Sequence, residues 1–324
     1  KVYVENIFGS GNEKTRENVI RRELKLYPGD VFSRSKLMRS QRDIWILNYF
    51  DNVIPDVTPI SDDKVNLDFV VEEKKSTQRI NANLGFTGEY GITGGAGVEF
   101  DNFRGKGQKL NIGASTGTNF SIYTTQEPSK YRSLNISFQD PMINDSPYLV
   151  GASIFYSFRG SSTNYYFPLD FTVGGAVASF GRMLEWPDDF FRVMWSAKFM
   201  QKEYEGSQSD IDNYIGGLQK TRGISLSQVL SRDSRNRAEF PTNGSTFILE
   251  NTYSGGFLGG NENFQKHMLT LDWFTPTFSK FVLYNSVKLG VIKTIDVGDD
   301  IQSFVPFDER FIMGGNGIPY GNAL

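Results

Sequence analysis

The spacing of apolar residues divides the chain into two parts that predict different structures. From Ser76 onward, apolar and polar positions alternate with a period of two, as in β-strands that have one apolar face. Before Ser76, apolar residues also recur three or four positions apart, which is the spacing of one helix face. The sequence therefore predicts a small mixed domain over residues 1–75 and an all-β domain over residues 76–324.

The first part predicts the element order β-α-α-β-β. Its expected elements are a strand over residues 2–8, helices over 15–26 and 33–48, and strands over 50–58 and 64–72. Thr15 is expected to cap the first helix, and the second helix is expected to begin after Ser33. In the last strand Val65 and Leu67 alternate with polar residues, so one face of this sheet is expected to be buried.

The second part predicts roughly eleven antiparallel strands. Many of its alternating runs approach the ~9–11 residues that cross a bilayer at a tilt, whereas strands of soluble proteins average about 5–6 residues. A transmembrane β-barrel therefore explains the pattern better than a soluble sandwich. The side chains expected to face lipid include Ile80, Leu84, Ile136 and Leu289.

Aromatic residues and connector lengths favour the same fold. Aromatic girdles mark the two membrane interfaces of such barrels, and the candidates near strand ends are Tyr148, Phe158, Phe171, Phe191 and Trp273. Long and short connectors alternate, with the short turn at residues 88–91 as an exception. Outer-membrane barrels place their short turns in the periplasm, so the small domain is expected there too.

Composition excludes several kinds of protein. The net charge is −3, from 34 basic and 37 acidic residues, which gives no electrostatic footprint for nucleic acid. The chain has no Cys, so disulfides, thiolate zinc sites and thiol nucleophiles are excluded. No run approaches the roughly 18 apolar residues of a membrane-spanning helix.

Candidate catalytic residues are few, and each has a simpler explanation. Residues 113–117 read G-x-S-x-G, but they lie inside an alternating run without the following helix that a nucleophile elbow needs. His267 opens a predicted strand, so a surface or lumen position is expected. We therefore predict no catalytic residue, no metal site and no cofactor, with calcium in the outer loops as an alternative.

Charged clusters in the predicted connectors allow two interpretations. Adjacent carboxylates at 62–63, 188–189 and 299–300 are expected to be solvated. A mixed cluster could contact peptide in the lumen or form mutual ion pairs, and ion pairs are the simpler interpretation. Its members are Arg232, Asp233, Arg235, Arg237 and Glu239.

Several motifs together resemble one known family. In order, they are Gly11-Asn12, Val19-Ile20-Arg21-Arg22-Glu23-Leu24, Pro28-Gly29, Asn48-Tyr49-Phe50, Phe69-Val70-Val71-Glu72-Glu73-Lys74, Asp101-Asn102-Phe103-Arg104-Gly105-Lys106-Gly107, Arg232-Asp233-Ser234-Arg235-Asn236, Phe240-Pro241-Thr242-Asn243-Gly244 and Pro306-Phe307-Asp308-Glu309-Arg310-Phe311. Their order and spacing resemble the BamA-type outer-membrane assembly family, from its last polypeptide-transport-associated (POTRA) domain into its barrel. The resemblance implies an α+β POTRA domain followed by an incomplete antiparallel transmembrane barrel.

The same resemblance implies that the sequence is a fragment. Family barrels have about sixteen strands, and an Arg-Gly-aromatic tripeptide at the tip of the sixth extracellular loop would be expected just after Leu324. The approach to that tip is expected at Pro306, Phe307, Gly314 and Gly315. Upstream POTRA domains and the last barrel strands would lie outside the sequence.

The function implied by the resemblance is non-enzymatic insertion of client β-barrels into the bacterial outer membrane. An incoming strand must satisfy its backbone hydrogen bonds before it meets lipid, and the edge of the first barrel strand can offer a template. That edge is expected at Gln78, Arg79, Ile80, Asn81, Ala82, Asn83, Leu84, Gly85, Phe86, Thr87 and Gly88. The implied partners are client outer-membrane proteins, accessory lipoproteins and outer-membrane lipid.

Related functions stay open at this point. A member of the same family could secrete one dedicated partner protein or assist autotransporter assembly. A passive porin is a third alternative, but porins lack a POTRA-like module, so residues 1–75 argue against it.

Overall fold

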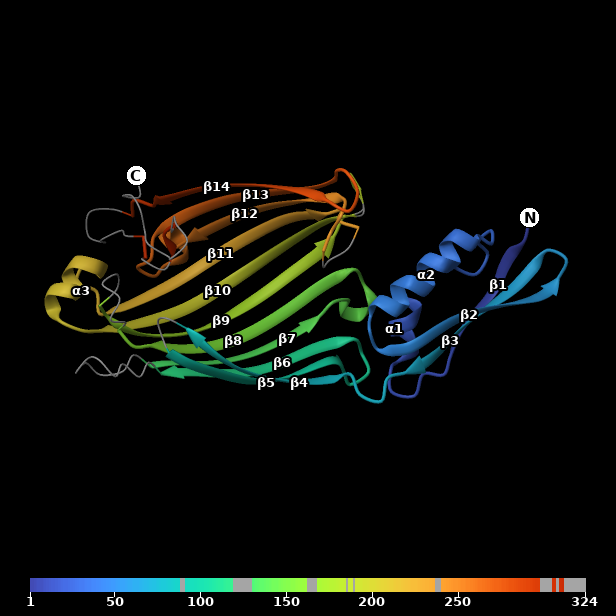
Figure 1. The fold of residues 1–324 in the computed structure, drawn as a ribbon, viewed down its shortest axis with the longest axis horizontal. Helices are drawn as coiled ribbons and strands as arrows, with labels where there is room; N and C mark the ends of the chain where they lie inside the picture. The colour runs from blue at the N-terminus through green and yellow to red at the C-terminus, as the bar shows by residue number, and fades with distance from the viewer. Residues whose placement is uncertain are drawn as a thin grey trace. The chain divides into compact units, whose positions relative to one another are not determined.

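The computed structural model contains a small α+β module followed by an antiparallel sheet (Figure 1). The residues that the structure describes are 1–87, 91–118, 130–161, 168–184, 186–188, 190–236, 240–297, 305–306 and 309–311. No helix in this described part is long and apolar enough to cross a membrane.

The N-terminal module has the predicted order β-α-α-β-β. Its elements are β1 (Tyr3–Ser10), α1 (Glu17–Arg21), α2 (Arg34–Ile46), β2 (Phe50–Ser61) and β3 (Lys64–Glu73). In its sheet β3 is central, parallel to β1 and antiparallel to β2. The alternation predicted for β3 is confirmed, because Val65, Leu67 and Phe69 are buried in one core with Val19 and Ile20 of α1.

The first helix is shorter than predicted, and its expected cap was wrong. Arg16 is the N-cap and its side chain makes no capping bond, while the helix ends at Arg21. Thr15 instead gives its backbone N–H to the Glu73 carboxylate at 2.6 Å, so a tertiary contact fixes the chain where a local cap was expected. Ser33 does cap α2, accepting the backbone N–H of Lys36.

The rest of the described chain forms the eleven predicted strands. They are β4 (Gln78–Thr87), β5 (Gly91–Phe103), β6 (Gln108–Thr118), β7 (Lys130–Asp140), β8 (Tyr148–Arg159), β9 (Asp170–Met183), β10 (Phe191–Glu205), β11 (Lys220–Asp233), β12 (Gly244–Ser254), β13 (Phe264–Pro276) and β14 (Val282–Thr294). Each strand pairs with its neighbours in the sequence, so β4 and β14 are the two ends of the sheet. A helix, α3 (Gln208–Ile215), lies in the β10–β11 connector, and single 3-10 turns occur at Ile143–Asp145 and Gly256–Leu258.

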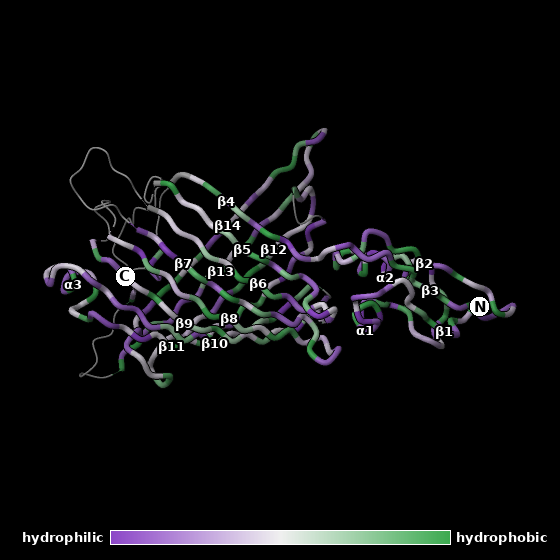
Figure 2. The backbone as a smooth tube through the Cα atoms, turned by 90° about the horizontal axis from the view of Figure 1, so that it is seen from below, coloured by the Kyte–Doolittle hydropathy of each residue, from purple (hydrophilic) through white to green (hydrophobic). Residues whose placement is uncertain are grey.

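The two faces of this sheet differ as the alternation predicts. Hydrophobic and hydrophilic residues are interspersed along the strands of the sheet (Figure 2). On the outward face, Ile80, Leu84 and Leu289 are 80%, 83% and 60% exposed, and Ile136 lies two residues from exposed Leu134 on β7. Apolar side chains that protein does not cover are what a lipid-facing surface requires.

The expected aromatic girdle is only partly correct. Tyr148 and Trp195 each stack on Phe180, at ring separations of 5.5 and 6.0 Å, which forms an aromatic row across three strands. Phe171, in contrast, packs on the inward face against Tyr204 and the cluster that Ile211 of α3 completes. The prediction failed for Phe171 because nearness to a strand end does not specify which face a residue occupies.

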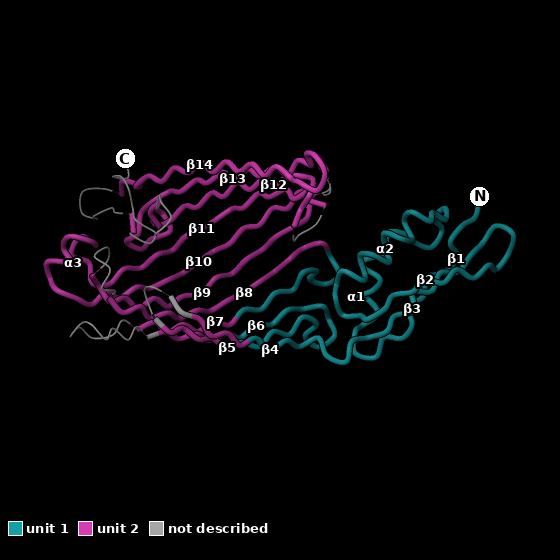
Figure 3. Tube along the Cα trace, viewed as in Figure 1, with its two compact units in different colours: residues 1–81, 97–112, 137–146 teal, residues 82–96, 113–136, 147–324 magenta. Residues whose placement is uncertain are grey.

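The contacts divide the chain into two compact units that do not follow chain order (Figure 3). Unit 1 contains Lys1–Asn81, Gly97–Ile112 and Ser137–Ser146, so it joins the N-terminal module to one end of strands β4 to β7. Unit 2 contains the remaining residues. The turn between β5 and β6 thus belongs to the same compact unit as the module.

An arginine in place of Ile154 should destabilise the membrane-inserted protein by about 2–4 kcal/mol, because Ile154 is outward-facing, mid-strand and 56% exposed. The same replacement at Ser153, the neighbouring inward position, should have a much smaller effect. The measurement is the free energy of unfolding in lipid vesicles. Equal losses for both variants would contradict the assignment of the two faces.

Candidate functional site

Strand β4 is the first candidate, because it forms one end of the sheet. Along one side β4 pairs with β5, and no described strand pairs with its other side. Ten of the eleven residues proposed for the edge lie in β4, whereas Gly88 lies outside the described residues. The backbone of an end strand offers unpaired donors and acceptors to another strand.

Ion pairs hold one end of β4 to the neighbouring strand. Arg79 contacts Glu99 and Asp101 of β5 at 3.0 and 2.9 Å, and Asp101 is buried. The backbone N–H of Asp101 also donates to the Thr77 carbonyl at 3.3 Å. Because these contacts converge on residues 77–79, the beginning of β4 is the fixed end of the strand.

Small residues line the other half of β4. A Cβ on Gly95 of β5 would lie 2.7 Å from Oδ1 of Asn83, so Asn83 occupies the space that the missing side chain leaves. A Cβ built on Gly85 would have one neighbour within 4 Å, the Thr93 hydroxyl oxygen at 3.4 Å. Glycine contributes little side-chain packing, so this half of the β4–β5 pair is held mainly by its backbone.

The turn between β5 and β6 contacts the N-terminal module within unit 1. Asn102 donates its amide N–H to the Thr15 hydroxyl at 2.8 Å, and the Arg16 backbone N–H donates to the Gly105 carbonyl at 2.8 Å. The Tyr49 hydroxyl lies 3.4 Å from the Gly107 carbonyl, and burial raises the pKa of Tyr49 to about 12, which keeps it a donor. We call these contacts the module–turn junction.

Glu73 organises the module side of this junction. Its two carboxylate oxygens accept the backbone N–H groups of Lys14 and Thr15 at 2.8 and 2.6 Å. Although burial alone would raise the pKa of Glu73, these hydrogen bonds lower it below its ordinary value. The ionised carboxylate therefore stabilises the loop that leads into α1.

Replacing Glu73 by Gln should raise the hydrogen-exchange rates of the Lys14 and Thr15 amides about fivefold at pH 7, since a charge-assisted hydrogen bond is lost. Because the pKa of Glu73 is lower in the folded protein than in the unfolded chain, where it is near 4.5, the ionised carboxylate stabilises the folded protein at pH values above 4.5. This stabilisation is lost as the pH falls through the folded-state pKa. The difference in amide exchange rate between the Glu73→Gln variant and the unchanged protein should therefore shrink below pH 4.5. Glu72→Gln is the control, because Glu72 is exposed. A similar change in that variant would contradict the role of Glu73.

The predicted approach to the sixth loop is only partly described. Pro306 is buried, while Phe307, Gly314 and Gly315 lie outside the described residues. Nearby, Lys266 on the inward face of β13 forms an ion pair with Glu309 at 3.1 Å and lies over the Phe311 ring at 5.3 Å. This short segment therefore lies against the inward face of β13.

Ser115, the serine of the G-x-S-x-G sequence, lies in strand β6 and shares a 2.6 Å hydrogen bond with the Ser133 hydroxyl. This segment is strand and not the strand-to-helix turn of a nucleophile elbow. His267 is exposed in β13, and its Nδ1 lies 2.8 Å from Oδ1 of Asn251. These positions agree with the structural interpretation of both residues.

The charged cluster forms ion pairs where it is described. Arg232 pairs with Asp188 at 2.8 Å, and Arg235 pairs with Asp233 at 2.6 Å. Arg237, Glu239, Asp189 and the pair at 299–300 lie outside the described residues. The ion-pair interpretation is therefore favoured for the described members.

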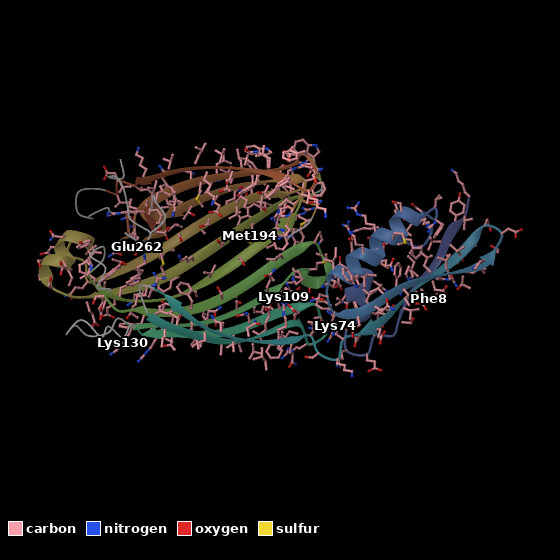
Figure 4. The ribbon with its side chains drawn as sticks, in the orientation of Figure 1. Phe8, Lys74, Lys109, Lys130, Met194 and Glu262 are labelled. Carbon is pink, nitrogen blue, oxygen red and sulfur yellow. The ribbon has the colours of Figure 1, made fainter. Side chains whose placement is uncertain are left out.

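Sequence reasoning missed a buried ion pair on the inward face. Lys202 of β10 and Glu262, which precedes β13, are 1% and 0% exposed and lie 3.2 Å apart. The Thr221 hydroxyl donates to the same Glu262 oxygen at 2.6 Å. In Figure 4, Glu262 lies near the end of the strands that is close to α3, whereas Met194 lies toward their other end. Alternation places Lys202 on the inward face, but nothing in the connector sequence indicates that Glu262 folds back to meet it.

Two family models match separate parts of the chain. An Omp85 superfamily domain matches residues 102–323. A POTRA model, described as a surface antigen variable number repeat, matches residues 2–74. The two models together cover most of the chain.

Curated relatives match nearly the whole chain. One is an outer membrane protein assembly factor BamA from Nitratidesulfovibrio vulgaris, 28% identical over 97% of this chain and 37% of the relative. Another is the BamA of Neisseria meningitidis serogroup B, 26% identical over 99% of this chain and 40% of the relative. The chain therefore spans about two fifths of the length of these relatives.

Solved structures share the fold. BamA from Haemophilus ducreyi lacking POTRA domains 1–3 superimposes with a TM-score of 0.72 at 19% identity, covering 98% of this chain and 59% of that one. CdiB from Acinetobacter baumannii superimposes with a TM-score of 0.57 at 16% identity, covering 99% of this chain and 57% of that one. These likenesses support a POTRA module followed by part of an antiparallel barrel.

Proposed function

This chain belongs to the Omp85 superfamily, and on that premise we propose that it is part of a protein that folds and inserts client β-barrel proteins into the bacterial outer membrane. Residues 1–75 form its periplasmic POTRA domain. Residues 76–324 form the first part of its barrel and lead into the sixth extracellular loop. Its relatives named above are assembly factors, which supports insertion as the activity.

The observation that carries the mechanism is the position of β4 at the end of the sheet. A client strand that adds to β4 forms its backbone hydrogen bonds before it enters lipid, where each unpaired polar group costs several kcal/mol. The Arg79 ion pairs hold the beginning of β4, whereas Gly85 and the Gly95 that faces Asn83 give the other half little side-chain packing. In this proposal one end of the strand fixes the register while the other end separates. No covalent chemistry is required.

The partners follow from this activity. Client outer-membrane proteins supply the incoming strands, accessory lipoproteins bind the periplasmic domain, and outer-membrane lipid surrounds the apolar face. A second function, export of one dedicated partner protein, is kept because the fold also resembles CdiB. We rank assembly first, because the relatives that match nearly the whole chain in sequence are named assembly factors.

A cysteine pair joining Asn83 to the final strand of the complete barrel tests the proposed role of the edge. The chain has no native Cys, so the engineered bond would be unambiguous. Oxidation should stop client insertion while the barrel stays folded, since clients lose their pairing edge, and reductant should restore insertion.

The matched control is a cysteine pair at Leu269 and Leu289, which face each other across β13 and β14. This bond joins the two strands at the opposite end of the described sheet from β4, so it should leave insertion unchanged. Full client insertion in protein whose β4 edge is completely cross-linked would show that edge exposure is unnecessary. Equal inhibition by both bonds would point to general rigidity as the cause.

A further inference from the structure

A recess opens at the end of β10 and β11 that lies nearest to α3. Its volume is about 350 Å³. Its lining residues are Gln201, Lys220, Thr221, Arg222, Gly260 and Asn261. None of these residues belongs to the proposed client-pairing edge.

The recess exists because β12 is shorter than β11. Pairing between the two strands ends at Ser225 and Ser254, so the first residues of β11 extend beyond it. The β12–β13 connector fills part of this gap, because Asn261 accepts the Arg222 backbone N–H at 2.6 Å and returns its own backbone N–H to the Arg222 carbonyl at 2.9 Å. Gly260 allows this approach, since a Cβ there would lie 2.4 Å from the Arg222 carbonyl oxygen. The connector thus forms a fixed wall of the recess.

The recess carries one unpaired positive charge among the described residues. Lys220 is neutralised by Glu203, whose carboxylate lies 2.7 Å from its ammonium group. Arg222 is exposed, and no described residue forms an ion pair or hydrogen bond with its guanidinium group. An arginine fork presents donors that match the oxygens of a phosphate group.

Arg222 also lies at the boundary of the apolar face. The register pairs Phe199 with Ile224 as the last apolar row on the outward face, and Gln201 with Arg222 as the next outward row. An arginine at this height keeps its aliphatic stem beside lipid chains while its charged group reaches the headgroups. With the POTRA domain in the periplasm, as proposed above, this boundary faces the outer leaflet.

We propose that this recess binds the phosphate group of an outer-leaflet lipid, with Arg222 as its main ligand. The recess supplies shape, the unpaired guanidinium supplies charge, and the neighbouring apolar rows contact the acyl chains. The inference rests on the orientation in the proposed function, but not on client insertion. It assigns a lipid site to a part of the barrel away from the β4 edge.

The test uses the complete protein in detergent micelles, with native mass spectrometry to count bound lipid. The probe is diphosphorylated lipid A, compared with its dephosphorylated form and with inorganic phosphate as competitor. Arg222→Gln should weaken binding of the phosphorylated probe roughly tenfold, and Arg222→Lys should restore part of it. Arg132→Gln is the matched control, because Arg132 is likewise the third residue of its strand and exposed, but does not line the recess.

Each outcome decides the proposal. Selective loss in Arg222→Gln, with little binding of the dephosphorylated probe, supports it. Equal weakening by both glutamine variants overturns it, because the binding would then not depend on this recess. Equal binding of both lipids also overturns it, because the binding would then not depend on the phosphate group. Full competition by millimolar inorganic phosphate would make the recess a site for free anions and also overturn it. Client insertion measured on the same samples tests the proposed function separately, since lipid binding does not require a client.

Discussion

Replacing Glu262 by alanine is expected to lower the free energy of unfolding of the barrel by about 3–5 kcal/mol, because it removes one partner of a buried ion pair. Lys202 is 1% exposed and lies 3.2 Å from Glu262. The Thr221 hydroxyl would lose its acceptor as well. The measurement is urea unfolding of the complete protein in lipid vesicles.

Two further variants make this result specific to burial. Glu203→Ala breaks the exposed pair with Lys220, whose members are 44% and 63% exposed, and should change the free energy by at most about 1 kcal/mol. The double variant Lys202→Met with Glu262→Leu should recover most of the loss, since it removes both buried charges. A loss in the double variant as large as in Glu262→Ala would contradict the explanation.

The second large effect is expected at the module–turn junction. Gly105 has a φ of +68°, and a Cβ on it would lie 1.9 Å from the Lys14 carbonyl oxygen. Alanine at this position is strained by about 1–2 kcal/mol and also pushes the turn away, which breaks the hydrogen bonds at Thr15 and Arg16. Gly105→Ala should therefore lower the free energy of unfolding by about 3–5 kcal/mol in total, and hydrogen exchange at the Arg16 amide should become faster.

Gly29 provides the matched control for this prediction. Its φ is +93°, but nothing lies within 4 Å of where its Cβ would be. Gly29→Ala should therefore show the conformational strain alone, about 1–2 kcal/mol, with no change at the Arg16 amide. If the two variants lost the same free energy, the junction would contribute nothing beyond backbone strain.

The features that could be predicted from the sequence are local. Eleven strands and the facing of Ile80, Leu84 and Leu289 follow from a period of two, which each strand carries in its own residues. The order of elements in the module follows from helix and strand signals in the same way. The position of β4 at the end of the sheet agrees with its expected role, whereas templating itself stays a prediction.

The features that escaped prediction depend on partners distant in sequence. The local sequence predicts Thr15 as a helix cap. Its actual partner, the Glu73 carboxylate, is 58 residues away, so no local pattern indicates the contact. Phe171 was read as a girdle residue, because the helix α3 that covers it lies in a later connector. The Lys202–Glu262 pair joins residues with no shared local pattern. Arg222 gave no signal either, since its recess requires the early end of β12.

The parallel pairing of β1 with β3 has a consequence for the order in which the chain folds. Tyr3 lies opposite Lys64 and Ser10 opposite Val70, so the first strand cannot complete its ladder until about residue 70 is free to pair. Both helices and β2 must therefore be synthesised and released before the module can close. A chain that emerges N-terminus first would then hold a finished module before most of the barrel strands are available. Slow closure of this loop is the expected early kinetic step, ahead of any pairing in the barrel.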